Sequence, residues 1–311
     1  MATSGSTDFS VSRDDIITEA LEHCGVLAMG QTPNAAQLTS CSRTLNMMIK
    51  HWMADGLQLW KIQRATILLE KGKTEYDLSA TGDLATQSYV ETALSAASAA
   101  SDTTLTVDSI TGISASDVIA IQLDDGTLHK DAVNGAPSGS TVTITTGLSS
   151  AAAIDRPVYA FTTKINRPNR IINAFTRDSS GNDVDVDLIS REEYWRLGDK
   201  DASGTPTQLY HDPQLAVNTV RIFPAPDDVT VSMEITYETP IEDYDNASDT
   251  PDFPQEWYEP LATNLALRLT TKFGTPAETT QKIALLAEKS YMMAIEFDNE
   301  DTSIMLVPDS R

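Results

Sequence analysis

The side chains best suited to metal binding or nucleophilic chemistry are few, and their spacing matches no common motif. His23 and Cys24 are adjacent, while Cys41 and His51 are far apart. Zinc sites usually contain close pairs such as C-x-x-C or H-E-x-x-H, because the ligands must converge on one ion, and neither pattern occurs. We therefore expect no metal and no other cofactor, and we interpret both thiols as small buried groups on packed helices.

Three aspartates, Asp183, Asp185 and Asp187, alternate with apolar residues like the first ligands of a calcium loop. Such a loop needs glycine at its sixth position and glutamate at its twelfth. Those positions hold Leu188 and Tyr194. The alternation instead predicts a strand with one wet face and one buried face.

Other catalytic signals are missing from the sequence. Carboxylates are so abundant that no acid pair stands out, and G-x-S-x-G, G-x-x-x-x-G-K and G-x-G-x-x-G do not occur. Those motifs build a nucleophile elbow, a phosphate loop and a dinucleotide loop. We expect no enzyme activity and no catalytic residues, and a catalytic site without a local motif stays open as an alternative.

The N-terminal region predicts two helices. Ser12 can cap the first, which ends at Gly25, and Thr32-Pro33 has the cap and first-turn proline of a second helix that stops near Gly56. Each helix has one apolar seam at three- and four-residue steps. The seams consist of Ile16, Ile17, Ala20, Leu21 and Cys24, and of Leu38, Cys41, Leu45, Met48 and Trp52.

A second helical pair is predicted near the C-terminus. Its first helix begins at Pro254 and stops at Gly274, and Thr275-Pro276 starts a last helix that reaches about Phe297. The faces expected to pack together are Leu261, Leu265, Leu269 and Phe273 in one helix and Ile283, Leu286, Met293 and Phe297 in the other. Because every seam needs cover, we expect helices from both ends of the chain to form one bundle.

Antiparallel β patterning fills the sequence between the helical pairs. A strand over Leu59–Leu69 and a return strand through Tyr76 and Leu78 predict a hairpin. From Thr86 to Phe161, short strand patterns in small aliphatic and hydroxyl residues predict an inserted small β domain. Further strands are expected over 170–175, 184–188, 219–223 and 229–237, with a short helix capped by Ser190 and Glu193.

The predicted fold class is therefore α+β: a helical bundle of N- and C-terminal helices with antiparallel β elements and an inserted small β domain. The predicted segments are 1–85 (N-terminal helices and first hairpin), 86–161 (insert), 162–297 (remainder of the core with the C-terminal helices) and 298–311 (extended tail).

The charge of the chain restricts its partners. The 311 residues carry a net charge of −23, and nucleic-acid binding depends on Lys and Arg. Ile222 to Leu267 contains eleven Asp or Glu and no Lys or Arg, which predicts a solvated face or a wall that DNA passes without adhering. We expect the modest basic cluster Lys164, Arg167 and Arg170 to pair with acids. No apolar run approaches the roughly 18 residues of a membrane span, so no membrane association is expected.

Several short motifs occur in a recognisable order. They are Leu45–Trp52 followed by Gly56 and a strand, Arg167–Ile171, Ile222–Pro226, and Phe253–Trp257 leading into Leu265–Leu267 and Phe273-Gly274. They cover the N-terminal quarter and about the last 140 residues. In this order they resemble the head-to-tail adaptors of short-tailed, podovirus-like phages, which are tail accessory proteins that bind beneath the portal ring.

The resemblance implies a structural protein of the virion neck that is made in the host cytoplasm. Copies would form a ring, expected to be a dodecamer, that binds the portal protein, extends the DNA channel and offers a platform for tail nozzle or fibre proteins. DNA would pass through without specific binding. The insert over 86–161 departs from the smallest members of the family, which are shorter, and no catalytic residue carries over.

Three other functions stay open. One is another phage tail component, such as a nozzle or fibre attachment protein. A second is a cell-wall-degrading virion enzyme, which would need a cleft with two suitably placed carboxylates. The third is a carbohydrate-binding module built on the insert, which would need exposed aromatic rings, and Ala93–Arg156 contains none.

The sequence after the last helix changes from acidic to apolar. Ile304, Met305, Leu306 and Val307 form an apolar run that Pro308 ends. Four consecutive apolar residues cannot all face one side of an extended strand, so a free tail would leave some of them in water. We predict that these four residues bind a groove on the portal or on a neighbouring subunit, and a mobile end is the alternative.

Overall fold

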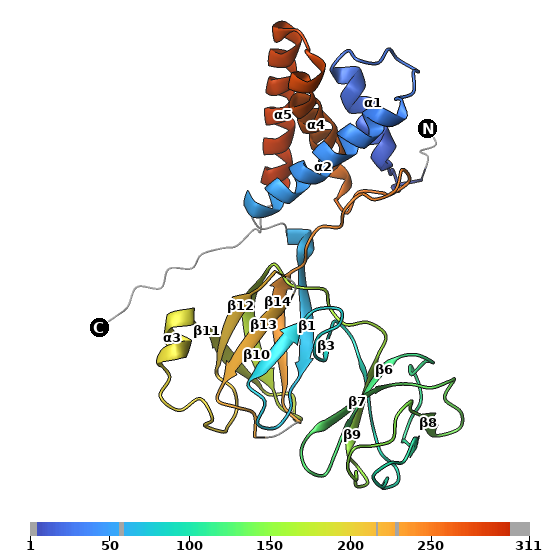
Figure 1. Ribbon diagram of the computed structural model, residues 1–311, viewed down its shortest axis with the longest axis vertical. Coiled ribbons are helices and arrows are strands. Elements are labelled where there is room, and N and C mark those ends of the chain that lie inside the picture. Colours follow the sequence, from blue (N-terminus) through green and yellow to red (C-terminus); the bar gives the residue numbers. More distant parts are fainter. Residues whose placement is uncertain (1–4, 56–58, 216, 228–229, 299–311) are drawn as a thin grey trace. The chain divides into compact units, whose positions relative to one another are not determined.

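The computed structural model describes residues 5–55, 59–215, 217–227 and 230–298. It contains 28% helical and 28% strand residues, which confirms the predicted mixture of α and β structure. The chain divides into two compact units (Figure 1). We call Met1–Lys61 together with Ile241–Arg311 the helical unit, and Ile62–Pro240 the sheet unit.

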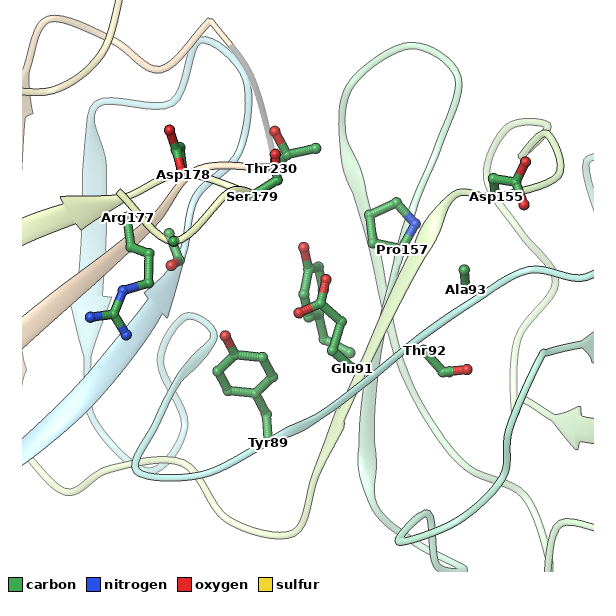
Figure 2. A pocket seen from close by; sticks show the side chains of 13 residues that line it. Tyr89, Glu91, Thr92, Ala93, Asp155, Pro157, Arg177, Asp178, Ser179 and Thr230 are labelled. Atoms are coloured by element: carbon green, nitrogen blue, oxygen red, sulfur yellow. The ribbon is translucent and has the colours of Figure 1, made fainter. Parts of the chain in front are cut away.

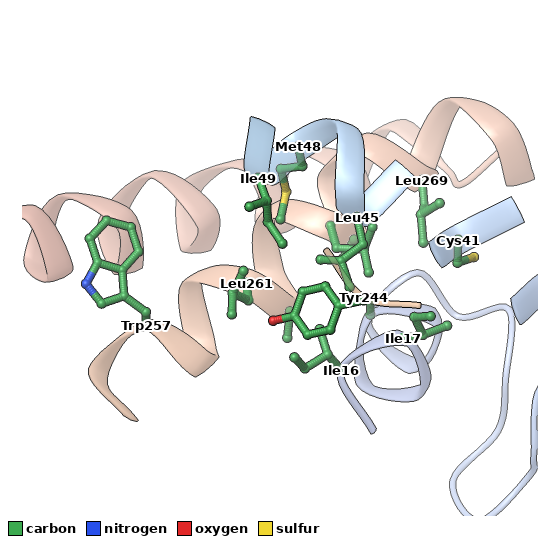
Figure 3. Close-up of a cluster of buried hydrophobic side chains, with 14 of the residues drawn as sticks. Ile16, Ile17, Cys41, Leu45, Met48, Ile49, Tyr244, Trp257, Leu261 and Leu269 are labelled. Atoms are coloured by element: carbon green, nitrogen blue, oxygen red, sulfur yellow. The ribbon is translucent and has the colours of Figure 1, made fainter. Parts of the chain in front are cut away.

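Four helices of the helical unit share one apolar core (Figure 3). They are α1 (Arg13–His23), α2 (Ala35–Asp55), α4 (Tyr258–Phe273) and α5 (Ala277–Phe297), with 3-10 turns at Leu59–Lys61 and Gln255–Trp257. The predicted seams of α1, α2 and α4 all enter or border this core. Phe253 and Trp257, from the last resembling motif, pack in it against Trp52 and Trp60 at ring-centroid distances of 5.2 to 6.4 Å.

The helix ends show which local signals set the boundaries. Ser12 caps α1 as predicted, in a reciprocal capping box with Asp15. The predicted start of α2 at Thr32-Pro33 is wrong, because Asn34 and Gln37 each accept a hydrogen bond from the other's backbone amide at 2.9 Å. This exchange satisfies two backbone donors at once, so α2 starts at Ala35.

The main sheet of the sheet unit has eight strands and is nearly closed. The strand order is β2-β13-β12-β11-β10-β14-β1-β3, and β11 with β12 is the one parallel pair among the described strands. The strands are β1 (Ile62–Leu68), β2 (Glu75–Leu78), β3 (Ala85–Thr86), β10 (Arg170–Arg177), β11 (Asp183–Leu188), β12 (Gln208–Pro213), β13 (Asn218–Phe223) and β14 (Ser232–Glu238). The short helix α3 (Arg191–Arg196) starts at the predicted capping box of Ser190 and Glu193.

The predicted hairpin of β1 and β2 does not form. β1 pairs with β14 along its whole length, and on its other edge Thr66 and Ile67 pair with β3. After the turn near Gly72, β2 instead pairs with β13 at the other end of the strand order. Alternation identified both strands but not their partners, because pairing depends on long-range register.

The insert forms β structure with its own core. Its strands are β4 (Val90–Ala93), β9 (Pro157–Phe161), β6 (Val118–Gln122) and β7 (Leu128–Ala132), paired in that order, and β5 (Thr104–Thr106) paired with β8 (Thr141–Thr143). The core contains only Leu, Ile, Val and Ala, as the aromatic-free stretch predicts. A second cluster joins Tyr159 and Phe161 of the insert to Leu68 and Leu84, so neighbouring segments complete its burial.

Candidate interaction surface

The last helix, α5, contacts the core through Ile283, Tyr291 and several small side chains. Its buried residues are Ile283, Ala287, Ser290 and Ala294. Ser290 Oγ lies 2.9 Å from Thr263 Oγ1 of α4, and Asn264 Nδ2 donates a hydrogen bond to the Ala287 carbonyl oxygen at 3.2 Å. Because the distance between packed helices depends on the side chains at the contact, these small residues allow a close approach of α5 to α4.

Apart from Ile283 and Tyr291, the larger apolar residues of α5 are exposed to solvent. The expected packing of Leu286, Met293 and Phe297 against α4 is therefore wrong, and of that predicted face only Ile283 is buried. We call the exposed set the α5 surface: Leu285 (69% exposed), Leu286 (37%), Met292 (52%), Met293 (61%) and Phe297 (68%). Residues seven positions apart share a helix side, so Leu285 and Met292 form one apolar row and Leu286 and Met293, followed by Phe297, form a second. Lys289 lies three or four positions from the first four of these residues, so a charged side chain stands between the two rows.

Charged residues accompany the α5 surface. Lys282 Nζ lies 2.7 Å from Glu278 Oε1, and both side chains are largely exposed. Lys289 and Glu296 follow Lys282 at seven-residue steps. Because an exposed ion pair contributes only about 0–1 kcal/mol to stability, the Lys282–Glu278 pair adds little to the stability of the helix.

The predicted partner-binding residues Ile304, Met305, Leu306 and Val307 lie outside the described residues. The chain leads to them from Asp298, directly after α5. The Asp298 amide donates to the carbonyl oxygens of Ala294 and Ile295, and its carboxylate accepts from the Leu59 amide at 3.3 Å. In the sequence, the apolar tail segment thus follows closely on the end of the α5 surface.

The basic cluster is used within the fold. Arg170 Nε lies 2.7 Å from Glu238 Oε2, which confirms the expected pairing with an acid for this residue. Lys164 and Arg167 instead donate to the carbonyl oxygens of Gly82 and Gln214. Burial also lowers the pKa of Lys164, since a low-dielectric environment disfavours its charge.

The basic-free segment 222–267 includes an acidic loop in the helical unit. Residues of this loop line a cavity of about 450 Å³ between Glu242 and Asp252. Asp249 accepts hydrogen bonds from the Asp245 and Asn246 amides, which hold its pKa below the ordinary value. Asp243 pairs with Lys50 at 2.8 Å. Several of these acids therefore shape the loop itself, while the rest add negative charge to its surface.

A groove of about 610 Å³ lies within the sheet unit, between β4 and β9 of the insert and the turn after β10 (Figure 2). Arg177 lines it but is held in a two-bond pair with Asp183, at 2.7 and 2.9 Å. Tyr89 and Tyr159 meet edge to face at 5.7 Å, and Tyr159 is only 6% exposed. Sugar stacking needs an exposed ring face, which Tyr159 does not offer here.

Motifs could not have located this groove, because its lining comes from four distant segments of the chain. Among the residues that the structure describes, no cluster of His, Cys, Asp and Glu is suited to hold a metal ion. Cys24 and Cys41 are both buried, and burial raises the pKa of each thiol. Within the described ranges, no helix is long and apolar enough to cross a membrane.

Comparison with protein-family models finds no match to this chain, and comparison with curated proteins finds none either.

Proposed function

We propose that this protein is a head-to-tail adaptor of a short-tailed phage. In this role it is a structural virion protein that forms a dodecameric ring beneath the portal, extends the DNA channel and provides a platform for nozzle or fibre proteins. The helices from both chain ends act together as the bundle that faces the assembly. The order of the motifs at Leu45–Trp52, Arg167–Ile171, Ile222–Pro226 and Phe253–Trp257 supports the proposal.

The α5 surface carries this proposal. Monomeric soluble proteins rarely expose large contiguous apolar patches, and those that occur often mark interaction sites. Here two rows of exposed apolar residues lie between Leu285 and Phe297 of α5, and a further apolar run follows within the tail. An assembly protein has partners for both, whereas a freely diffusing enzyme would have no use for either.

The acidic composition suits passage of DNA without binding. Ile222–Leu267 carries acids without a single Lys or Arg, and like charge raises the cost of close phosphate approach. Salt weakens this repulsion over about 10 Å at 0.1 M. We place this segment at the ring surface or the channel wall.

Removal of the tail tests the proposal. Truncation after Asp301 should abolish binding to portal protein, because Ile304–Val307 would be lost, while the melting temperature of the isolated chain stays within about 1 °C since no described core residue is removed. Binding would be measured by co-sedimentation with purified portal rings, and folding by circular dichroism.

A matched variant separates apolar docking from tail length. Replacing Ile304 and Leu306 together with Ser keeps the tail but removes half of its apolar run, and it should weaken binding by at least tenfold. Replacing Asp309 and Ser310 with Ala should leave binding unchanged. Normal portal binding by the truncated chain would refute the docking role, and failure of the intact chain to bind any portal would refute the adaptor assignment.

A further inference from the structure

We propose that the α5 surface is covered by a second copy of this chain, and specifically by the outward side of its α2. This inference rests on the proposed ring, because it assigns the contact between neighbouring copies. Two observations carry it: the extent of the α5 surface, and the unusual charge of α2.

The α5 surface is large enough to supply most of a stable contact. A large apolar side chain offers on the order of 150–250 Å², so the five exposed fractions together leave roughly 500 Å² of apolar surface. A standard protein interface covers about 800 Å² of each partner. One copy's α5 surface therefore provides more than half of what a stable neighbour requires.

The outward side of α2 has the complementary character. In a chain with 45 acidic and 22 basic residues, α2 contains no acid from Ala35 to Ala54. Its exposed residues recur every three to four positions and include Arg43, Met47 (54% exposed), His51 and Ala54. No described residue forms an ion pair with Arg43.

The charges of the two helices match. On α5, Glu278 is already paired with Lys282 at 2.7 Å, while the exposed Glu288 lies three positions after Leu285 and four before Met292, so an acid adjoins the apolar residues. Complementary charge sets register and excludes wrong partners. If Met47 of one copy packs against the exposed methionines and leucines of α5 in the next copy, Arg43 lies one helical turn away and beside a glutamate of that α5.

A contact of α5 with α5 is disfavoured by symmetry. An isologous contact uses the same patch on both copies and closes after two. A contact between different patches repeats from copy to copy and closes into a ring when the rotation allows. The α5-to-α2 pairing is of the second kind, and an incomplete arc keeps one free patch of each type, at its two ends, until the ring closes.

Cross-linking of mixed variants tests the pairing. Met47→Cys and Met293→Cys would be made as separate proteins, concentrated and treated with a short bis-maleimide, while the native thiols Cys24 and Cys41 are buried. We expect covalent dimers in the mixture but not in either variant alone, and a ladder of multimers from the double variant. Dimers of Met293→Cys alone would show an α5-to-α5 contact and overturn the assignment, as would the absence of cross-links in every sample.

A second measurement keeps self-association separate from portal binding. The paired substitutions Leu285→Glu and Met293→Glu should weaken self-association by at least tenfold in sedimentation equilibrium. The pair Ile154→Glu and Val184→Glu, which adds the same two charges at exposed apolar residues of the sheet unit, should leave it unchanged. If α5 variants self-associate normally, the assigned interface is wrong, whereas loss of portal binding by the unmodified chain would count against the adaptor function alone.

Discussion

Two lysines and two acids hold the insert against the rest of the sheet unit. Lys130 Nζ on β7 lies 2.6 Å from Glu70 Oε1 and 3.1 Å from Asp83 Oδ1. Lys73 Nζ lies 2.5 Å from the same Asp83 oxygen and 3.1 Å from Glu70 Oε1. Burial by itself would raise the pKa of Asp83, but hydrogen bonds from Lys73, the Asp77 amide and Lys130 outweigh it and hold that pKa below the ordinary value.

The lowered pKa of Asp83 makes this contact sensitive to acid. A group whose pKa is lower in the folded state adds stability above its unfolded pKa of about 3.9, and that contribution is lost as the pH falls through the folded value. We expect Asp83→Asn to destabilise the sheet unit by about 1–3 kcal/mol at neutral pH, because the lysines lose a charged partner. Below about pH 3 the difference from the unmodified chain should shrink.

Thermal unfolding followed by circular dichroism at several pH values measures this effect. Asp108→Asn, at an exposed position of the insert, serves as control and should change stability by less than about 0.5 kcal/mol. A difference for Asp83→Asn that stays constant from neutral to strongly acidic pH would contradict the titration.

At the scale of elements, α5 has apolar residues on two sides. The spacing of these residues along the sequence therefore does not predict which side packs against α4. Ala287, Ser290 and Ala294 form the packed side, and the large residues Leu285 and Met293 form the exposed side. A rule that places the largest hydrophobic residues in the core holds for Ile283 and Tyr291 but fails for Leu286, Met293 and Phe297, which are exposed. The small residues at the contact allow α5 to pack close to α4. The hydrogen bond between the hydroxyl groups of Thr263 and Ser290 crosses this contact.

Overpacking of the close side should therefore cost stability. Ala287→Leu places extra methylene groups where α5 meets α4, and we expect the free energy of unfolding to fall by about 1–3 kcal/mol. Met293→Ala, on the exposed side of the same helix, should change it by less than about 0.5 kcal/mol. Urea unfolding of dilute protein, followed by the helical circular dichroism signal, provides both values, and equal effects would show that the two sides of α5 are not distinct.

Local chemistry predicts most elements, and long-range pairing explains most errors. Caps at Ser12 and Ser190 and the left-handed glycine at Gly274 marked helix ends correctly. The strand Gln208–Pro213 follows the turn residues Ser203-Gly204 and Pro206 but has no clear alternation, and alternation is the signal by which the other strands are predicted. On β11 the expected buried face is realised only at Val186, because Val184 and Leu188 are 46% and 42% exposed. The α5 surface could be found only once the packed side of the helix was known.

At the scale of the whole molecule, the sheet unit is inserted into the helical unit through two adjacent connections. Its first strand β1 and its last strand β14 pair, with Ile62 opposite Glu238. The predicted boundaries at 85/86 and 161/162 fall inside this unit. Both ends of the sheet unit are therefore tied within its own hydrogen-bond network.

The sheet unit should consequently fold on its own. We expect a fragment covering Ile62–Pro240 to give a β-type circular dichroism spectrum and a cooperative unfolding transition, because its cores draw on residues of that range alone. A fragment ending at Lys61 should form little stable helix, since its seams lack α4 and isolated helices are marginal in water. An unfolded Ile62–Pro240 fragment would show that the sheet unit depends on the helices.

The adjacent connections also set an order of events during synthesis. α1 and α2 leave the ribosome first, but the core that they share with α4 and α5 cannot close until the last part of the chain has been made. The sheet unit is complete at Pro240, and domains generally fold as units while the chain grows. Once β14 has paired with β1, the two points where the chain leaves the sheet unit are held side by side. The chain segments that lead to α2 and to α4 therefore start close together. Each doubling of the length of a flexible loop adds about 0.6 kcal/mol to the cost of closing it. Because the folded sheet unit shortens the effective loop between α2 and α4, it lowers the entropic cost of packing these helices together.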